Sequence, residues 1–474
     1  MLATARSDWT ISGTVVDENG KAVKGASVVG INYDKRRVET TTNERGEFEL
    51  AGPALGNTFP LFITDAKRTR LFVRDAFREN HETQSRIDAV LVPNRDVTVE
   101  IVDAGGKPVA DATVLLRERM IDVEQHKTGH DGLVKLRVPG NASITCIYAL
   151  KSGAGYDYYS NTRVVEKGKQ PDAAEIPARL KLTLAGSRTL KVRAIDSQDR
   201  PMAGVPIIPF SVVRKGKTGD TNFSGAELFQ ATTGPDGVAE FDWMPADLEG
   251  TVSFVSLTET LWSPEQLRLD FANGQIDLRV LRRTVLAGHV RQPDGKPAAG
   301  RLVQARGAGY SDLPGFGHAI SAADGRFEMQ VCPEHAYTLV VEDDRWVANR
   351  VGIVVREDQP VTDVDLQLVQ GTVLIGRVLR GPDNTAVPDT QVHAVLEGGP
   401  IPAELKDPGR PFRNVTPEMS FALWRKTNAD GKYRFVLGPG EYRVYSPPHS
   451  VPGHFNLTVS GEVEREFDIQ ILEE

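Results

Sequence analysis

The feature that most constrains this chain is a pair of short motifs that recurs five times in a fixed order. The first motif is a turn followed by a short apolar segment, and it is centred on Lys21, Lys107, Arg200, Lys296 and, more weakly, Thr385. The intervals between these positions are 86, 93, 96 and 89 residues. Because a period of that length matches one small domain, the sequence indicates a tandem array of five modules.

The second motif is a glycine turn that opens an alternating segment, at Gly46, Gly132, Gly237, Gly325 and Gly431. A proline follows each glycine after seven or eight residues, at Pro53, Pro139, Pro245, Pro333 and Pro439. Glycine supplies the positive φ that tight hairpin turns require. The segment after it alternates apolar and polar residues, as in Tyr433, Phe435 and Leu437, which is typical of a strand with one buried face.

No sustained helical period occurs in the sequence, so short strands between Gly/Pro turns predict an all-β chain of sandwiches. Each proposed last strand runs within a few residues into the next first strand. This places the modules at residues 1–93, 94–184, 185–281, 282–369 and 370–474. The linkers are short, so we expect an elongated array, extended or curved, in which each module buries its own core.

The composition excludes several classes of protein. The formal net charge is −8, and no dense run of Lys and Arg is present, so we expect no nucleic-acid partner. No segment approaches the roughly 18–20 apolar residues of a membrane helix, and the first nine residues lack the apolar core of a signal peptide. The two cysteines, Cys146 and Cys332, lie in different modules, which excludes a disulfide framework.

The combination of Gly-Lys-Pro before a small apolar strand, Asp-Gly-x-aromatic, and the run Leu437 to Val444 resembles the carboxypeptidase regulatory-like domain. That family shares its seven-stranded transthyretin-like sandwich with collagen-adhesin B-type repeats and some starch-binding domains. The resemblance implies five tandem seven-stranded Ig/transthyretin-like β sandwiches. It also implies an exported or surface-attached bacterial protein in which the modules are non-catalytic accessories.

Common catalytic and metal-binding motifs are absent from the sequence. There is no Gly-x-Ser-x-Gly, His-Glu-x-x-His or phosphate-binding loop. Transthyretin-like hydrolases carry Tyr-Arg-Gly-Ser, whereas the nearest run here is Tyr442 to Tyr445, and the His-x-His pair of related dioxygenases is missing. The segment that contains His126, His130 and Asp131 is more typical of a polar surface loop than of a metal site. We therefore expect no enzyme activity, no catalytic residue, no metal and no cofactor.

Two departures from the module pattern are candidate ligand sites. Four tyrosines, Tyr148, Tyr156, Tyr158 and Tyr159, fall within twelve positions, and tyrosine suits the binding of sugars or peptides. The alternative is that some of these rings fill the end of a sandwich. Because adjacent strand residues point to opposite faces, Tyr158 and Tyr159 cannot lie in the same core.

The second departure is the long excursion from about residue 397 to residue 426, which carries Phe412, Phe421 and Trp424. A loop of this length in a compact domain is usually functional or disordered. Its aromatic residues argue against full disorder, and these three side chains are also candidate ligand contacts.

The sequence therefore predicts a non-catalytic extracytoplasmic bacterial scaffold or binding protein, as the accessory region of a larger surface or membrane protein. Two alternatives remain open: a carbohydrate-binding array, and the regulatory region of a metallopeptidase. The expected partner is a protein or polysaccharide ligand, and the chain is expected to be a monomer. The periplasmic or cell-surface location follows from the family resemblance alone.

Overall fold

The computed structural model describes most of the chain as β-structure. The described residues are 10–31, 37–51, 58–77, 84–118, 121–140, 145–161, 176–212, 214, 227–248, 252–256, 258, 260–263, 274–309, 315–343, 345–402, 405, 419–447 and 455–471. Within them the one named helix is a single 3-10 turn, η1 (Glu227–Phe229). The predicted all-β fold class is confirmed.

Two facing sheets form the first part of the chain. In one, β1 (Thr10–Asp17) lies between antiparallel β4 (Glu47–Ala51) and the parallel strands β7 (Gln84–Arg86) and β8 (Ala89–Leu91). The other has the order β3-β2-β5-β6, with β2 (Ser27–Ile31), β3 (Arg37–Thr41), β5 (Thr58–Thr64) and β6 (Leu71–Phe77). Ile11, Val28 and Leu61 are fully buried between these sheets, so alternation along each strand creates the core.

The second sheet pair repeats this topology. One sheet places β9 (Arg95–Asp103) between antiparallel β12 (Leu133–Val138) and parallel β15 (Arg179–Leu184). The other has the order β11-β10-β13-β14, with β10 (Thr113–Glu118), β11 (Ile121–Lys127), β13 (Thr145–Lys151) and β14 (Gly155–Ser160).

The third part keeps the same first sheet and has a smaller second sheet. In the first sheet, β16 (Ser187–Ile195) lies between β19 (Val238–Pro245) and β22 (Gln275–Arg279). The second sheet has the order β18-β17-β20, with β17 (Pro206–Ser211), β18 (Ala231–Thr232) and β20 (Ser253–Val255). A separate two-stranded sheet joins β21 (Leu261–Trp262) to β23 (Leu281–Arg282).

The fourth part contains a sheet of five strands in one row. Its first sheet places β24 (Thr284–Arg291) between β27 (Arg326–Val331) and β30 (Val361–Gln367). Its second sheet has the order β26-β25-β28-β29-β31, with β25 (Leu302–Gly309), β26 (Gly315–Ile320), β28 (His335–Glu342), β29 (Trp346–Val355) and β31 (Val369–Gln370).

The fifth part is built around β32 (Thr372–Arg380), which pairs with antiparallel β36 (Lys432–Leu437) and β33 (Thr385–Ala386). The parallel strands β39 (Glu464–Glu466) and β40 (Ile469–Ile471) complete this sheet. The facing sheet has the order β35-β34-β37-β38, with β34 (Gln391–Leu396), β35 (Phe421–Lys426), β37 (Gly440–Tyr445) and β38 (Phe455–Val459).

Both sequence motifs act as turns in the structure. The glycines of the second motif have φ between 71° and 80°, at Gly46, Gly132, Gly237, Gly325 and Gly431. The first motif folds back on the strand before it, as in the isolated bridges of Val102 with Pro108 and of Ile195 with Pro201. The predicted turn chemistry is thus confirmed, because left-handed backbone at these positions is open to glycine at little cost.

A buried hydroxyl four residues before each motif glycine was not anticipated from the sequence. In the second sheet pair, Thr128 Oγ1 donates to the carbonyl of Val109 at 2.6 Å and accepts from the Ala112 amide at 3.0 Å. The equivalent side chains make the same two bonds, and they are Thr42, Thr233, Ser321 and Thr427. Through these two hydrogen bonds, each hydroxyl connects the turn of the first motif to the end of the strand that precedes the second motif.

We expect Thr128→Val to destabilise the second sheet pair by about 1–3 kcal/mol, because it leaves the Val109 carbonyl and the Ala112 amide without their buried partner. Urea unfolding and amide hydrogen exchange at Ala112 measure this effect. Thr362→Val, on the exposed side of β30, is the matched control and should stay within about 0.5 kcal/mol. Equal stabilities of the two variants would contradict the role of the hydroxyl.

The sheet pairs are not independent in the way that the sequence predicted. One buried cluster contains Leu150 and Tyr156 of the second sheet pair together with Phe241 and Phe254 of the third. Similarly, Val340 of β28 belongs to the buried cluster of the fifth part. The expectation that every module buries its own core, with single chain crossings between modules, is therefore wrong at these junctions.

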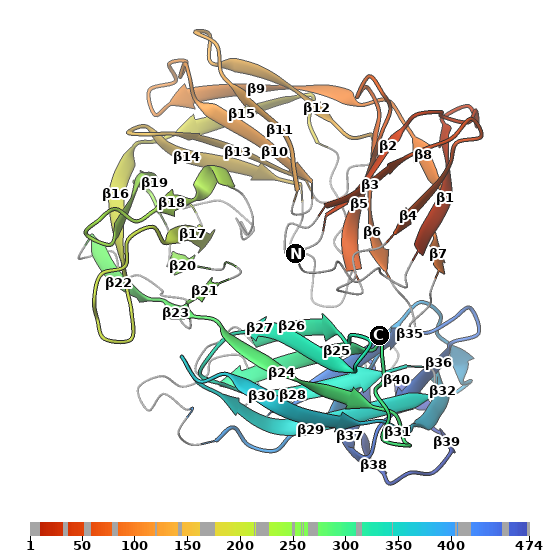
Figure 1. Cartoon of the computed structure of the whole chain (residues 1–474). Coiled ribbons are helices and arrows are strands. Elements are labelled where there is room, and N and C mark those ends of the chain that lie inside the picture. Colours follow the sequence, from red (N-terminus) through yellow and green to blue (C-terminus); the bar gives the residue numbers. More distant parts are fainter. Residues whose placement is uncertain are drawn as a thin grey trace.

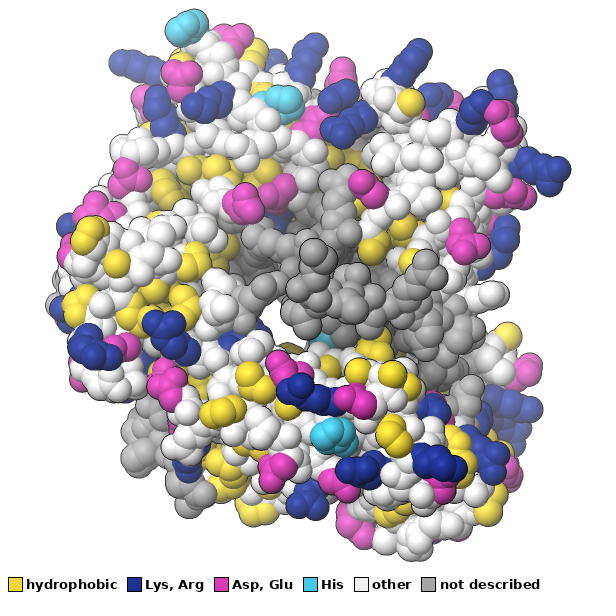
Figure 2. Space-filling model, in the orientation of Figure 1, with side chains coloured by type: hydrophobic (Ala, Val, Ile, Leu, Met, Phe, Trp, Pro, Cys, Tyr) yellow, Lys and Arg dark blue, Asp and Glu magenta, His cyan; other side chains and the backbone are white. Residues whose placement is uncertain are grey.

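The chain follows a curved path, so its sheets succeed one another around an arc and do not lie along a straight line (Figure 1). Figure 2 shows Lys and Arg interspersed with Asp and Glu over the visible face. In the described residues no helix has the length and hydropathy needed to cross a membrane. We propose that each sheet pair is one module, with bounds at 1–93, 94–184, 185–281, 282–369 and 370–474.

Candidate functional site

The tyrosine-rich segment forms an antiparallel hairpin at the edge of the second sheet pair. Tyr148 on β13 lies opposite Tyr158 on β14, and Leu150 lies opposite Tyr156. Gly153 makes the turn between the strands with φ at 71°. Since side chains alternate along a strand, Tyr148, Tyr156 and Tyr158 emerge on one face of this hairpin.

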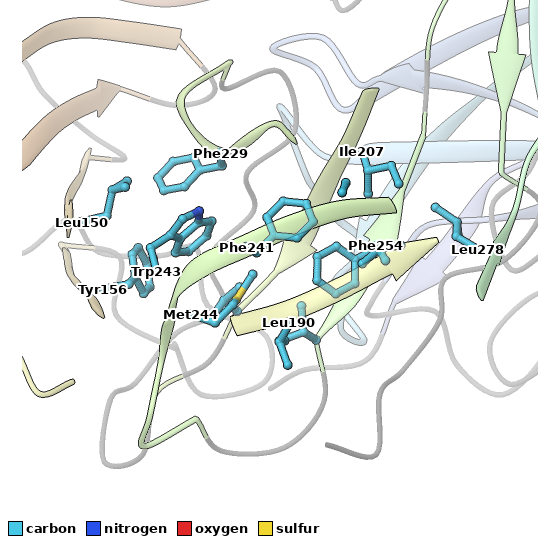
Figure 3. Close-up of a cluster of buried hydrophobic side chains, with 14 of the residues drawn as sticks. Leu150, Tyr156, Leu190, Ile207, Phe229, Phe241, Trp243, Met244, Phe254 and Leu278 are labelled. Atoms are coloured by element: carbon cyan, nitrogen blue, oxygen red, sulfur yellow. The ribbon is translucent and has the colours of Figure 1, made fainter. Parts of the chain in front are cut away.

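These three rings are buried, with exposed fractions of 2%, 0% and 1%. They belong to one buried cluster with Phe229 of η1 and Trp243 of β19, which are in the third part of the chain. Figure 3 shows Tyr156 beside Trp243 and Phe229. Ring centroids lie 5.6 Å apart between Tyr156 and Trp243, and 5.4 Å apart between Tyr148 and Phe229. The hairpin thus supplies half of an aromatic core that two successive sheet pairs share, which we call the aromatic junction. Burial raises the pKa of the Tyr148 hydroxyl above its ordinary value.

Tyr159 points away from the aromatic junction and packs against the core of the second sheet pair. Its neighbour Tyr158 belongs to the junction, so the predicted division between opposite faces is confirmed. Tyr148, Tyr156 and Tyr158 therefore fit the alternative hypothesis, in which some of the rings fill the end of the sandwich. A ligand could stack on those three rings only if the junction opened.

A buried ion pair closes the same junction. The Arg214 guanidinium contacts Asp157 Oδ1 at 2.8 Å and Asp247 Oδ2 at 2.5 Å, and it donates to the carbonyl of Thr183 at 2.8 Å. The Arg214 and Asp157 side chains are 6% and 3% exposed. Burial acts to lower the pKa of Arg214, but the two carboxylates outweigh it and leave the pKa raised. The pair therefore joins β14 to the third part of the chain through charges held away from water.

The backbones also meet closely at this junction. The Gly186 amide donates to the carbonyl of Ala154 at 3.0 Å, and the Ala246 amide donates to the carbonyl of Gly186 at 3.1 Å. A Cβ on Gly155, whose φ is 116°, would lie 2.4 Å from the Gly186 oxygen. Glycine at position 155 is thus required for the hairpin to approach the linker.

The three candidates from the long excursion have separate positions. Phe412 lies outside the described residues. Phe421 is buried in the core of the fifth part, where a ligand cannot reach it. Trp424 is half-buried on the opposite, outer face of the same sheet, and its strand partner is His393. The structure therefore does not bring these residues together with the tyrosines.

Sequence reasoning missed the partners that give the tyrosines their environment. Phe229, Trp243 and Arg214 lie between 57 and 95 residues further along the chain than Tyr148 to Asp157, and no motif connects them. Within the described residues, no group of three or more His, Cys, Asp or Glu side chains could hold a metal ion. The site is a packed junction. Its charged side chains pair with one another, Arg214 with Asp157 and Asp247.

Comparison with known proteins identifies the start of the chain. Residues 10–60 match the carboxypeptidase regulatory-like domain. Among curated proteins, none matches the chain.

Several solved structures match the chain at low sequence identity. The chain is 13% identical to the major pilin subunit of Bacillus cereus, with 58% of this chain and 99% of that one covered and a TM-score of 0.16. The Streptococcal ancillary pilin is 10% identical, with 60% of this chain and 99% of that one covered and a TM-score of 0.18. The Bacillus anthracis TIE protein is 12% identical, with 89% of this chain and 72% of that one covered and a TM-score of 0.17. Such low TM-scores mean that the chains do not superpose as whole bodies, so nothing about function follows from them.

The matched residues include β1, the first-motif turn, β2, β3 and β4, which together form much of the first sheet pair. Residues 10–60 of this all-β chain are therefore similar to the carboxypeptidase regulatory-like domain.

Proposed function

We propose that the chain is a non-catalytic extracytoplasmic scaffold or binding protein of bacteria, built of five carboxypeptidase regulatory-like sandwiches. In this proposal it is the accessory region of a larger surface or membrane protein. The observation that carries the proposal is the aromatic junction, in which two successive sheet pairs share one hydrophobic core. The family match at residues 10–60 supports the non-catalytic role, since it concerns an accessory domain.

A shared core fixes the angle between neighbouring modules. Bending at the aromatic junction would expose Tyr156 and Trp243 and would separate Arg214 from Asp157. Exposing aromatic surface costs free energy in proportion to its area, and separating a buried ion pair adds the cost of an unpaired charge. The junction consequently resists bending, which is the property that a spacer or scaffold needs.

The contact between the fourth and fifth parts has the same character. Glu342 on β28 pairs with Arg425 on β35 at 2.5 Å, and both side chains are nearly buried. Asn349 Nδ2 donates to the carbonyl of Pro439 at 2.9 Å. Two junctions held by side chains favour a stiff, curved particle over a chain of freely hinged modules.

Small-angle scattering tests the stiff, curved particle. We expect a radius of gyration clearly above the estimate of about 23 Å for a compact chain of this length. A value near that estimate would contradict an array of separate sandwiches.

Two further measurements address the other parts of the proposal. Purified protein should turn over no peptidase, esterase or hydroxyisourate substrate, and turnover that a point substitution in this chain abolishes would contradict the non-catalytic assignment.

Fractionation of native cells should recover the protein outside the cytoplasm, and recovery only in the cytosol would contradict the location.

A further inference from the structure

The outer faces of two neighbouring sheets carry a group of side chains that a scaffold does not require. On the fourth part, Arg306 of β25 lies directly opposite Phe316 of the edge strand β26. On the fifth part, His393 of β34 lies between Trp424 of β35 and Tyr445 of β37. We call these five residues the arginine–aromatic patch.

Strand alternation places every member of the patch on an outer face. Ala305, next to Arg306, lies in the core of the fourth part. In the fifth part, Val392 and Val444 lie in the core, next to His393 and Tyr445. Since successive side chains point to opposite faces, each patch residue points away from the core of its own sheet pair. Arg306 shares its sheet face with Val340, which packs against the fifth part.

The two sheets that carry the patch pack against each other, because Val340, on the same face as Arg306, belongs to the buried cluster of the fifth part. The Arg306 guanidinium lies 5.9 Å from the centroid of the Phe316 ring. Burial lowers the pKa of Arg306, and Tyr445 acts in the opposite direction, so Tyr445 lies within electrostatic reach of the guanidinium. The ring centroids of Tyr445 and His393 lie 5.2 Å apart.

Arg306 differs from the arginines near it. Arg301 on the same part pairs with Asp343, and Arg425 pairs with Glu342. Arg306 is half-buried, yet within the described residues neither a hydrogen bond nor an ion pair to a carboxylate engages its guanidinium. A partly desolvated guanidinium without a counter-charge favours a planar anion, above all a carboxylate that can accept two parallel hydrogen bonds.

Phe316 supplies a stacking surface beside that charge. Its side chain is 60% exposed, and among the described aromatic residues it is the only one in the exposed class. A stable protein interface usually buries about 800 Å² on each partner around an apolar centre, and one exposed ring provides far less. A sugar ring, by contrast, can rest one apolar face on a single aromatic side chain.

We propose that the arginine–aromatic patch binds an acidic polysaccharide, with a sugar ring stacked on Phe316 and its carboxylate paired with Arg306. Tyr445 and His393 supply polar atoms for the hydroxyl groups of a neighbouring sugar, and Trp424 extends the row across β35. This ligand class goes beyond the scaffold role and does not depend on it.

The test is isothermal titration calorimetry of the full chain with oligogalacturonate and with oligoalginate. Each ligand is paired with its carboxyl-reduced counterpart, which keeps the rings and loses the charge. Poly-glutamate serves as a carboxylate polymer without sugar rings. The variants are Arg306→Ala, Arg306→Lys and Phe316→Ala, and Arg291→Ala is the matched control because its guanidinium pairs with Asp365 outside the patch. Circular dichroism melts establish that each variant is folded.

We expect at least one acidic oligosaccharide to bind, and its carboxyl-reduced counterpart to bind at least about tenfold more weakly. Arg306→Ala should cause a similar loss, Arg306→Lys a smaller one, and Arg291→Ala none. Phe316→Ala should weaken the binding of the sugar and leave that of poly-glutamate unchanged. The proposal is overturned if neither acidic sugar binds, if Arg306→Ala binds like the wild type, or if poly-glutamate binds as tightly as the sugars.

Discussion

Replacing Arg214 with alanine is expected to destabilise the junction between the second and third sheet pairs by about 3–5 kcal/mol. The substitution leaves the Asp157 carboxylate buried without its cation, although the amides of Tyr158 and Thr183 still donate to it. A buried charge without a partner costs more than the pair itself contributes, so the loss should exceed that of an ordinary ion pair. Chemical denaturation, with hydrogen exchange over β14, measures it.

Two variants separate the buried charge from the loss of a side chain. Arg193→Ala breaks an exposed pair with Asp277 in the same part of the chain and should cost far less than Arg214→Ala. Arg214→Met/Asp157→Asn removes both buried charges and should recover much of the stability that Arg214→Ala loses. If Arg214→Ala and Arg193→Ala cost the same, the buried pair does not hold the junction.

Removing the ring of Trp243 is expected to cost about 3–5 kcal/mol and to loosen the neighbouring sheet pair as well. Trp243 is 7% exposed and contacts the rings of Tyr156 and Phe229. Trp243→Ala therefore leaves a cavity between two parts of the chain, and amide exchange should increase along β14, which belongs to the other part.

Phe254→Ala is the matched control for this prediction. Phe254 is fully buried and packs against Phe241, within the third part alone. It should destabilise the third part by a similar amount and leave exchange along β14 unchanged. Increased exchange along β14 in both variants would mean that the third part supports β14 as a whole, and that Trp243 has no special role.

The β-structure was predictable because it depends on local patterns. Gly132 and Gly237 form turns at positive φ, and alternation along segments such as Tyr433 to Leu437 decides which face is buried. The hydroxyl four residues before each motif glycine, as at Thr128, could have been found as well, since it recurs at a fixed offset. It was missed because serine and threonine are common in turns and carry no signal unless copies are aligned.

The environment of the tyrosines was not predictable in the same way. The alternation of Tyr158 and Tyr159 correctly divided them between two faces, but it did not say what each face meets. Tyr156 meets Trp243, and Asp157 meets Arg214, across a large separation in sequence. The same holds for Val340 of β28, which joins the buried cluster of the fifth part only through the packing of two sheets.

The sequence by itself determined the all-β class, the turns of the recurring motifs and the buried face of each strand. The reason is that φ preferences and a period of two residues act over a few neighbouring positions. Only the tertiary structure decided that Tyr148, Tyr156 and Tyr158 form a core between two sheet pairs and that Val340 of the fourth part joins the buried cluster of the fifth. These contacts depend on the angle between modules, which burial and charge pairing between distant residues fix, and no local pattern encodes that angle.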